Sequence, residues 1–530
     1  MYNPQISNEF VYSSLQQEPL SISFNTIDSI FNSININKAM GPDKIKPLLI
    51  KKMNLQNRKW FHVFFNVLLK LKIYPDSWKK AKIFPLHKRG TPSNDVNNFR
   101  PIAILSCLAK IYDKIIFHLV KSKTNLLELI PEFQHGFMEN KSTITALNTT
   151  TSWIKEKLNR NIPTVAVSVD VAKAFDSIDR ATLINLLHAN NIDSNLIELI
   201  ACFLSNRRGF VTWGGSCSEE FFMNKGTPQG SVLSPILFNF YLKDLSPPIC
   251  TNNIECKITQ FADDIIALFA NSDLMLVENK VNHYVNYLSN FFHSIHLAVN
   301  PDKSKFIIFH NNLYTYSNKT RKLIKNLSVK INNTNIGKVD SINYLGILFD
   351  KKLSFSEDTT QRIKNCNARF FNCYNVFKNK NLSNKIKVNL YKTLVRPIAT
   401  YGFIARCGMS SFLMEKYRLM ERKFLRICLG VKRRKDNKGW PRNLKLYEKF
   451  NISRIDNYCI KLIKNINAKG GNYETVYVNN TENIRQNRRL LEPSFLSTES
   501  FDNQFWLSSN NPLYNIGKNG GIVYDHIVKE

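Results

Sequence analysis

Two adjacent aspartates, Asp263 and Asp264, separate two apolar stretches near the middle of this 530-residue chain. Residues 257–260 and 265–269 on either side are typical of short, largely buried strands. We therefore expect a tight hairpin with the acidic pair at its turn. Neighbouring anions repel each other and burial increases that repulsion, so a bound divalent cation is the simplest explanation. The alternative is an exposed turn whose aspartates only cap the backbone.

A third aspartate, Asp170, lies near the end of another apolar stretch. Residues 164–171 are rich in valine and predict a buried strand, and a helical pattern follows from Arg180 to His188. A carboxylate on one strand and a pair on a neighbouring hairpin could share a metal site. Mg²⁺ binds one or two carboxylates, keeps waters and takes further oxygens from a phosphate substrate. Two such ions suit in-line attack at phosphorus.

A loop of glycine, proline and serine, residues 226–235, precedes an apolar helical pattern. Gly226 and Gly230 let the backbone approach a ligand closely, and Pro228 stiffens the turn between them. Ser231 is expected to cap the helix that follows. Taken alone, such a loop is more typical of a connection into a core helix than of a binding site.

Together and in this order, the three segments resemble the palm of reverse transcriptases, in particular those of non-LTR (LINE-type, jockey-like) retrotransposons. The resemblance rests on Asp170 with Phe175 five residues later, on Pro228-Gln229-Gly230, and on Phe261-Ala262-Asp263-Asp264. Further matching motifs extend it over about residues 30–430. They are Asn37–Asp43, Trp78–Gly90, Asn98–Ile102, Phe133–Phe137 with Ser142-Thr143, Asn300–Lys305, Tyr344–Asp350, and Leu394–Pro397 with Tyr401-Gly402.

The resemblance implies a catalytic and metal-binding role for three aspartates. Asp170 and Asp263 would be the principal ligands of two Mg²⁺ ions, or of Mn²⁺ in their place, with Asp264 as a supporting ligand. Phe175 would lie beneath the sugar of the incoming nucleotide and exclude a 2′-hydroxyl. The alternative for Phe175 is an ordinary core residue. We expect the adjacent Asp176 to alternate to the other side of the backbone and to be structural.

The same resemblance implies four further nucleotide-binding residues. Gln229 and the backbone of Gly230 would line the nucleotide pocket, and Arg100 would hold the triphosphate through its planar guanidinium. Lys303 would lie near the pyrophosphate as a point charge or a proton donor. Lys88 could also contact phosphate, but it belongs to a basic stretch that a solvated surface explains equally well.

The composition agrees with a nucleic-acid partner. The chain has 73 Lys and Arg against 41 Asp and Glu, a formal net charge of +32, spread along its length. Such a surplus is typical of proteins that bind polyanions. Basic residues also alternate with aromatic ones, as at Lys59-Trp60-Phe61, although most such rings are expected in helix cores. A membrane partner is not expected, because no run of about 18 uncharged apolar residues occurs and the N-terminus does not resemble a signal peptide.

Ten cysteines occur without Cys-x-x-Cys pairs or zinc-type spacing, so we expect free thiols in a reducing, intracellular compartment. The run Lys432–Lys435 is consistent with nuclear targeting or with a solvated edge, which leaves nucleus and cytoplasm open. The sequence leaves the oligomeric state open as well.

The predicted fold class is α+β, a right-hand polymerase fold with fingers, a palm built on an antiparallel sheet, and a helical thumb. The expected segments are a polar lead-in (1–35), an N-terminal motif with fingers (36–160), a palm (161–350), a helical thumb (351–430) and a C-terminal region without a usable motif (431–530). The reverse transcriptase domain is expected over about residues 65–350. Two departures from the resembled group, Asp358 in place of histidine and Arg406-Cys407 in place of tryptophan, are expected to weaken thumb packing.

The leading hypothesis is an RNA-directed DNA polymerase that adds deoxynucleoside triphosphates to a DNA primer on an RNA template. Since the endonuclease of full-length elements is not found, we expect an element fragment or an isolated polymerase reading frame. The alternative is a catalytically silent nucleic-acid-binding remnant. An RNA-dependent RNA polymerase is disfavoured because Phe175 would clash with a ribose hydroxyl.

Overall fold

A computed structural model describes residues 18–88, 92, 94–251, 253–407, 409–431, 446–448 and 451–467. Lys432–Lys435 and most of the predicted C-terminal region lie outside these residues. The chain divides into two compact units. The first comprises Met1–Gln134, Val171–Ser246 and Leu288–Val299, and the second comprises His135–Asp170, Pro247–Tyr287 and Asn300–Glu530. The predicted palm segment, 161–350, is therefore shared between the two units.

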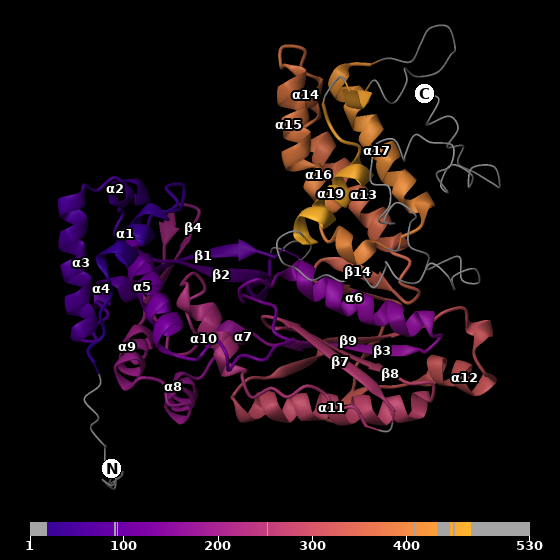
Figure 1. The fold of residues 1–530 in the computed structure, drawn as a ribbon, viewed down its shortest axis with the longest axis horizontal. Helices are drawn as coiled ribbons and strands as arrows, with labels where there is room; N and C mark the ends of the chain where they lie inside the picture. Colours follow the sequence, from indigo (N-terminus) through magenta and orange to yellow (C-terminus); the bar gives the residue numbers. More distant parts are fainter. Residues whose placement is uncertain are drawn as a thin grey trace. The chain divides into compact units, whose positions relative to one another are not determined.

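The first unit combines a small sheet with helices (Figure 1). Strand β1 (Lys80–His87) pairs antiparallel with β2 (Phe99–Ile104) and parallel with β4 (Arg208–Trp213), and β4 also pairs with β5 (Ser216–Cys217) and β6 (Phe221–Phe222). The helices are α1 (Phe24–Asn32), α2 (Pro47–Lys51), α3 (Leu55–Lys70), α4 (Asp76–Lys79), α5 (Cys107–Lys123), α7 (Ala174–Ser177), α8 (Arg180–Ala189), α9 (Ser194–Leu204) and α10 (Leu233–Tyr241).

Helix α1 lies within the segment expected to be a polar lead-in. Ser23 caps it by accepting a hydrogen bond from the Thr26 N–H, and Ile27, Ile30 and Phe31 are buried. These apolar residues follow a helical spacing, which the abundant asparagine and serine around them conceal in a composition-based prediction. The ordered structure therefore begins before the first predicted motif.

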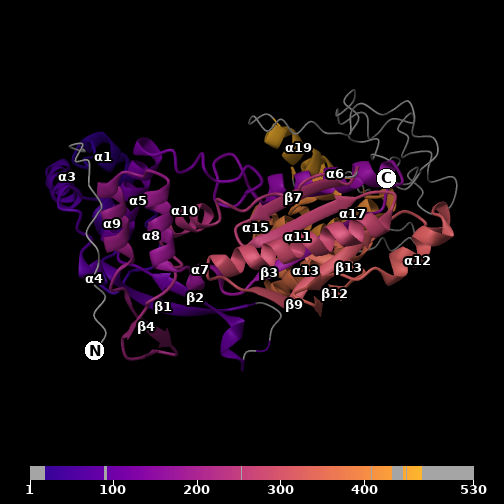
Figure 2. The same cartoon turned by 90° about the horizontal axis from the view of Figure 1, so that it is seen from below.

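The second unit is built on a sheet with the order β12-β9-β3-β8-β7. Its strands are β3 (Thr164–Val171), β7 (Glu255–Phe261), β8 (Asp264–Ala270), β9 (Val299–Phe309) and β12 (Gly337–Lys338). Helices α6 (Thr143–Asn159) and α11 (Leu274–Ser294) cover opposite faces of this sheet (Figures 1 and 2). Leu147 and Ile154 of α6 share a core with Ile266 of β8. The predicted strand and hairpin are confirmed, since valine-rich stretches buried on both faces form the centre of the sheet.

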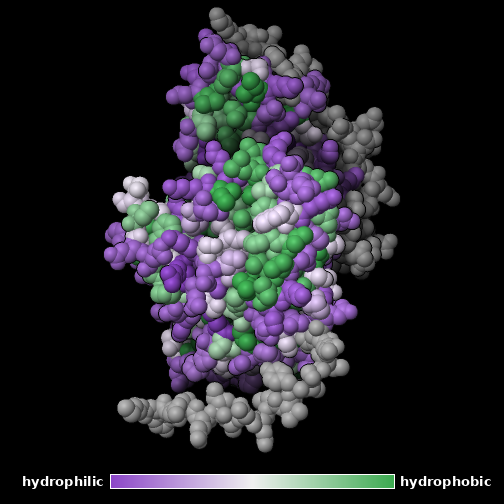
Figure 3. Space-filling view, turned by 90° about the vertical axis from the view of Figure 1, so that its left-hand side faces the viewer, coloured by the Kyte–Doolittle hydropathy of each residue, from purple (hydrophilic) through white to green (hydrophobic). Residues whose placement is uncertain are grey.

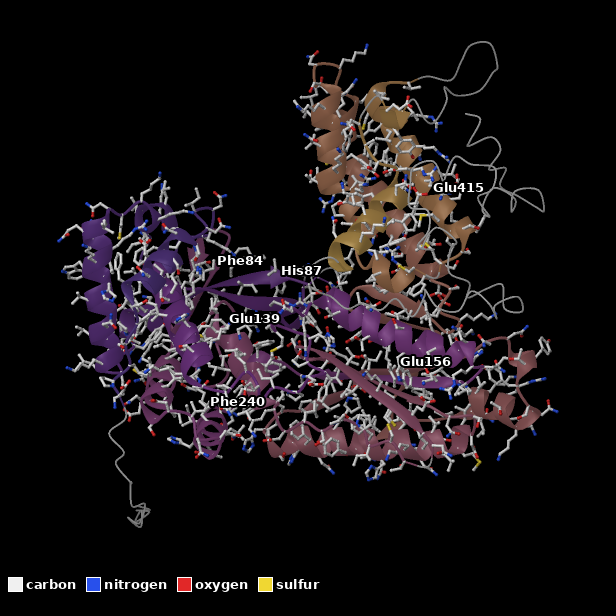
Figure 4. The ribbon with its side chains drawn as sticks, viewed as in Figure 1. Phe84, His87, Glu139, Glu156, Phe240 and Glu415 are labelled. Carbon is white, nitrogen blue, oxygen red and sulfur yellow. The ribbon has the colours of Figure 1, made fainter. Side chains whose placement is uncertain are left out.

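The same unit contains further helices, which extend beyond the predicted thumb segment 351–430 on both sides. They are α12 (Asn318–Asn326), α13 (Ser356–Asn372), α14 (Tyr374–Lys378), α15 (Asn384–Leu394), α16 (Arg396–Thr400), α17 (Ser411–Leu429) and α19 (Ile455–Asn467). Four short strands precede most of these helices. They are β10 (Lys330–Ile331), β11 (Thr334–Asn335), β13 (Ser341–Tyr344) and β14 (Ile347–Asp350). Buried ion pairs lie in this helical core: Glu415, labelled in Figure 4, pairs with Arg422 of the same helix α17, and Arg418 of α17 pairs with Asp456 of α19.

None of the described helices is both long enough and apolar enough to cross a bilayer. All ten cysteines are free thiols, as predicted from their spacing. Of the basic–aromatic stretches, Phe370, Tyr417 and Phe424 are buried in helix cores as expected, whereas Trp60 is exposed.

Candidate active site

Strand register brings two of the predicted catalytic aspartates to adjacent positions. β3 and β8 are antiparallel, and Val169 lies opposite Ile265. One further step along this register sets Asp170, near the end of β3, against Asp264, the first residue of β8. Residues directly opposite in an antiparallel pair project from the same face with Cα atoms about 4.5–5.5 Å apart. Two carboxylates distant in sequence are therefore neighbours at one end of the sheet.

Asp263 lies in the turn next to this pair. Because Phe261 pairs with Asp264, residues Ala262 and Asp263 form a two-residue hairpin turn, in which Ala262 has a φ of 55°. The tight turn predicted from the sequence is confirmed. However, Asp170 and Asp263 are only half-buried and Asp264 is exposed. The carboxylates are thus less desolvated than expected, since the burial of the apolar strands ends where the acidic residues begin.

Neighbouring residues of the second unit fix this end of the sheet. The Ser304 hydroxyl accepts a hydrogen bond from the Asp170 N–H at 3.2 Å and donates to the Asn300 carbonyl at 2.7 Å. Lys303, the predicted pyrophosphate contact, is exposed on β9 directly before Ser304. On β13, burial and the nearby charge of Asp264 raise the pKa of Tyr344. Lys303 is therefore adjacent in sequence to the residue that contacts Asp170.

No group of three or more His, Cys, Asp or Glu residues is arranged to hold a metal ion in the part of the chain that the structure describes. The structure thus sets Asp170 against Asp264 but does not assemble all three aspartates into one cluster. In donor type the residues fit the ion, because Mg²⁺ prefers carboxylate oxygens and completes its shell with water and phosphate.

The predicted nucleotide loop belongs to the first unit and is bonded to the segment after β3. The Gly226 N–H donates to the Ile178 carbonyl at 2.8 Å, and the Thr227 N–H donates to the Phe175 carbonyl at 3.0 Å. Gly226 has a φ of +71°, and a Cβ there would lie 2.6 Å from the Asp176 carbonyl oxygen. The glycine is therefore required both for its conformation and for this close approach.

The other end of the loop is bonded to the fingers strand β2. The Ala103 N–H donates to the Gln229 carbonyl at 2.9 Å, and a Cβ added to Gly230 would lie 2.1 Å from the Ala103 carbonyl oxygen. Arg100 is exposed on the same strand. The structure therefore brings Gln229, Gly230 and the Arg100 strand together within one unit.

Phe175 and Asp176 lie on the short helix α7, which corrects the extended alternation predicted for them. The half-buried Phe175 ring stacks on Phe238 of α10 with centroids 4.4 Å apart. Gln229 Nε2 donates to both carboxylate oxygens of Asp176 at 2.9 Å. Burial raises the pKa of Asp176, and the bond from Gln229 opposes that rise. Asp176 therefore orients the predicted pocket residue Gln229.

Two details of the loop were not foreseen. Helix α10 begins after Val232, which makes no side-chain capping bond, so Ser231 is not its N-cap; the Ser231 hydroxyl accepts from the Leu233 N–H at 3.1 Å instead. Behind the loop, the fully buried Asp113 accepts a hydrogen bond from the Tyr74 hydroxyl at 2.8 Å. The sequence indicates this buried bond only through the position of Asp113, a charged residue on the apolar face of the helix formed by residues 107–123.

A family model described as reverse transcriptase (RNA-dependent DNA polymerase) matches residues 86–349. The chain is 26% identical over 432 residues to the RNA-directed DNA polymerase from mobile element jockey of Drosophila melanogaster, covering 80% of this chain and 46% of that protein. It is 25% identical over 393 residues to the probable RNA-directed DNA polymerase from transposon BS of the same species, covering 73% and 42% respectively. The chain thus spans less than half the length of these relatives.

Among solved structures, a telomerase from Candida tropicalis in complex with a fragment of telomeric RNA matches at a TM-score of 0.37 and 14% identity, covering 81% of this chain and 70% of that one. The apo form truncated from the C-terminal domain matches at a TM-score of 0.32 and 15% identity, covering 55% and 58%. The family match confirms the predicted α+β class and right-hand polymerase fold. Residues 86–349 match the reverse transcriptase family, and over most of its length the chain is similar to the RNA-directed DNA polymerases of jockey and related non-LTR retrotransposons.

Proposed function

We propose that this chain is an active RNA-directed DNA polymerase that extends a DNA primer on an RNA template with deoxynucleoside triphosphates and releases pyrophosphate. The observation that carries the proposal is the β3–β8 register, which sets Asp170 against Asp264 beside a turn that holds Asp263. A structural sheet gains nothing from three carboxylates at one end, since like charges opposite each other are destabilising.

In the proposed reaction, Asp170 and Asp263 would be the principal ligands of two divalent cations, with Asp264 in support. Bound there, Mg²⁺ would lower the pKa of the primer 3′-hydroxyl and neutralise charge on the phosphates. Arg100 holds the triphosphate through paired hydrogen bonds. Lys303, an exposed point charge on β9, acts on the leaving pyrophosphate.

The pocket residues are proposed to select and orient the nucleotide. The Phe175 ring, held by Phe238, blocks the space that a 2′-hydroxyl would occupy. Gln229 is oriented by Asp176, and the backbone of Gly230 lies against Ala103 of β2. These contacts pre-organise the pocket and need no rearrangement on binding.

Primer extension on poly(rA)/oligo(dT) with Mg²⁺ tests the proposal. The wild-type chain should incorporate dTTP, and Asp263→Ala should reduce incorporation by at least about 10³-fold, because charge stabilisation at phosphorus is lost. Asp340→Asn is the matched control, since Asp340 is 82% exposed and pairs with the surface residue Lys351. Equal incorporation by wild type and Asp263→Ala would overturn the assignment. Binding of the template–primer without any extension would favour the silent remnant.

A further inference from the structure

Helix α3 in the first unit exposes an apolar stripe to solvent. The stripe consists of Trp60, Val63 and Val67 on the helix and of Leu71, which directly follows its last residue. In this order, the four residues are 64%, 61%, 48% and 57% exposed. Their spacing of three or four residues puts them on one face of the helix. In Figure 3, which faces these N-terminal helices, apolar side chains gather into a continuous area. We refer to these four residues as the α3 stripe.

The stripe is not part of the core that holds α3 in place. The opposite side of the helix supplies Phe65, Leu68 and Leu69, which are buried. A helix on a protein surface normally presents polar residues outward, and a contiguous apolar area on the outside marks an interaction site. The Trp60 ring is also held in place, because it stacks on Phe64 with centroids 5.7 Å apart at 13°. The stripe is thus a rigid surface that is ready to be covered.

The segment that carries the stripe contains basic but no acidic residues, and two of its basic residues pair with acidic residues from elsewhere in the fold, Arg58 with Asp28 and Lys72 with Glu198. Residues 44–75 contain no aspartate or glutamate and eight basic residues: Lys44, Lys46, Lys51, Lys52, Arg58, Lys59, Lys70 and Lys72. Lys59 and Lys70 are exposed. Lys59 precedes Val63 by four residues and Lys70 follows Val67 by three, so both flank the stripe along the helix. A partner that covers the stripe therefore meets positive charge at its edge.

We propose that the α3 stripe docks an amphipathic helix of a partner protein whose apolar seam is flanked by acidic residues. Apolar residues at three- and four-residue steps match the seam of a second helix, and flanking charges of opposite sign fix its orientation. This partner satisfies both the apolar stripe and its basic edge. The site is separate from the proposed polymerase residues.

Other occupants fit these observations less well. A second copy would bring the same basic segment against itself, on a chain that already carries a net charge of +32. A nucleic acid would satisfy the lysines but would leave Val63 and Val67 against phosphates. An anionic bilayer would also attract the lysines, but the short valines at the centre of a helix packed into the fold reach little depth for insertion.

The probe is a fluorescein-labelled synthetic helix of about three heptads, with leucine in the seam and glutamate at the flanking positions. Fluorescence anisotropy with the full chain, at about 0.15 M salt, measures its affinity. Val63→Ser combined with Val67→Ser removes the centre of the stripe and leaves every charge in place, so binding should weaken by about 10- to 100-fold. Phe412→Ser with Leu419→Ser on α17 is the matched control, because these residues are 57% and 56% exposed and lie in the other unit.

A charge exchange tests the acidic edge of the partner. Lys59→Glu with Lys70→Glu should reverse the preference, so that a peptide with the same seam and lysine flanks binds better than the glutamate peptide. The wild-type chain should prefer the glutamate peptide by at least about 10-fold. Primer extension should be unchanged in Val63→Ser/Val67→Ser, which leaves every charge in place, and this separates the proposal from the polymerase assignment.

Four results would overturn the proposal. The first is that the wild-type chain does not bind the glutamate peptide. The second is that the peptide binds but Val63→Ser/Val67→Ser does not weaken its binding, which would indicate non-specific attraction. The third is sedimentation equilibrium showing a dimer that the same double variant dissociates, which would assign the stripe to a second copy. The fourth is stripe-dependent binding of phosphatidylserine vesicles without peptide binding, which would assign it to a lipid surface.

Discussion

Asp358 of α13 and Arg406 contact each other in the second unit, with Arg406 Nε 3.5 Å from Asp358 Oδ2 and both residues buried. The resembled group has histidine in place of Asp358 and tryptophan in place of Arg406-Cys407. Each of these two departures was expected to weaken thumb packing. Because the two replacements carry opposite charges and are in contact, each supplies the partner that the other needs. The structure therefore accounts for the two departures as one compensated pair.

Asp358 also connects α13 to the β13–β14 hairpin. Its Oδ1 accepts from the Leu348 N–H at 3.1 Å, while Arg362 Nε donates to its Oδ2 at 2.6 Å. Arg362 Nη2 in turn donates to the Gly346 carbonyl in the hairpin turn at 2.6 Å. The hairpin and the first thumb helix are thus joined by one buried charged group.

Removing the charge of Asp358 should destabilise the second unit. Asp358→Asn leaves Arg362 and Arg406 without a buried counter-ion, so the free energy of unfolding should fall by about 3 kcal/mol. Arg406→Met should cost a similar amount, and the double variant should cost clearly less than the sum. Urea denaturation followed by circular dichroism measures all three values. Strictly additive costs would contradict the compensated pair.

Gly230 should tolerate no side chain. In Gly230→Ala the added Cβ would lie 2.1 Å from the Ala103 carbonyl oxygen, so the loop must move away from β2. We expect kcat/KM for the incoming nucleotide to fall at least about 100-fold, since small displacements of a positioned substrate have large effects on rate. Steady-state primer extension measures this. Gly337→Ala is the control, because nothing lies within 4 Å of a Cβ at Gly337.

Phe175 should set the choice of sugar. Phe175→Ala removes the ring that stacks on Phe238 and should raise the relative use of ribonucleotides by at least about 10-fold, because the steric exclusion is lost. Single-nucleotide incorporation of rUTP against dTTP gives the ratio. Phe175→Tyr keeps a ring and should keep the selectivity. An unchanged ratio in Phe175→Ala would show that this residue only fills the core.

Local patterns were sufficient to predict the end of the second sheet that carries the three aspartates. The valine-rich strand around Asp170 and the two apolar stretches around Asp263 and Asp264 each specify their own secondary structure, and the short turn leaves a single way to pair the hairpin. The exposure of the carboxylates was not predictable, since it depends on where neighbouring elements stop covering the strands. Helix α1 was missed because composition obscured its periodicity.

Contacts between distant residues were beyond a single sequence. Asp176 and Gln229 are 53 residues apart, and their bond is visible only once the loop folds against α7. The Asp358–Arg406 pair was interpreted as two separate weaknesses for the same reason. A charged residue on an apolar helical face, as at Asp113, indicates a buried partner but does not identify it.

Asp113 should make the stability of the first unit depend on pH. Burial raises the pKa of its carboxyl from the ordinary value of 3.8 to about 6, against the opposing influence of Ser231, Arg207 and Tyr74. Between these two pH values the folded chain binds more protons than the unfolded chain. The free energy of unfolding should therefore fall as pH rises through this window, by about 2–3 kcal/mol in all.

Asp113→Asn isolates this contribution, because an asparagine carbonyl still accepts from the Tyr74 hydroxyl but does not titrate. The difference in unfolding free energy between wild type and Asp113→Asn should shift in favour of the variant by about 2–3 kcal/mol from pH 4 to pH 7. Urea denaturation at unit steps of pH measures it, with Asp340→Asn as an exposed-carboxyl control that should show no such shift. A difference that stays constant across the window would mean that Asp113 is already charged at pH 4, with Arg207 neutralising it in place of a proton.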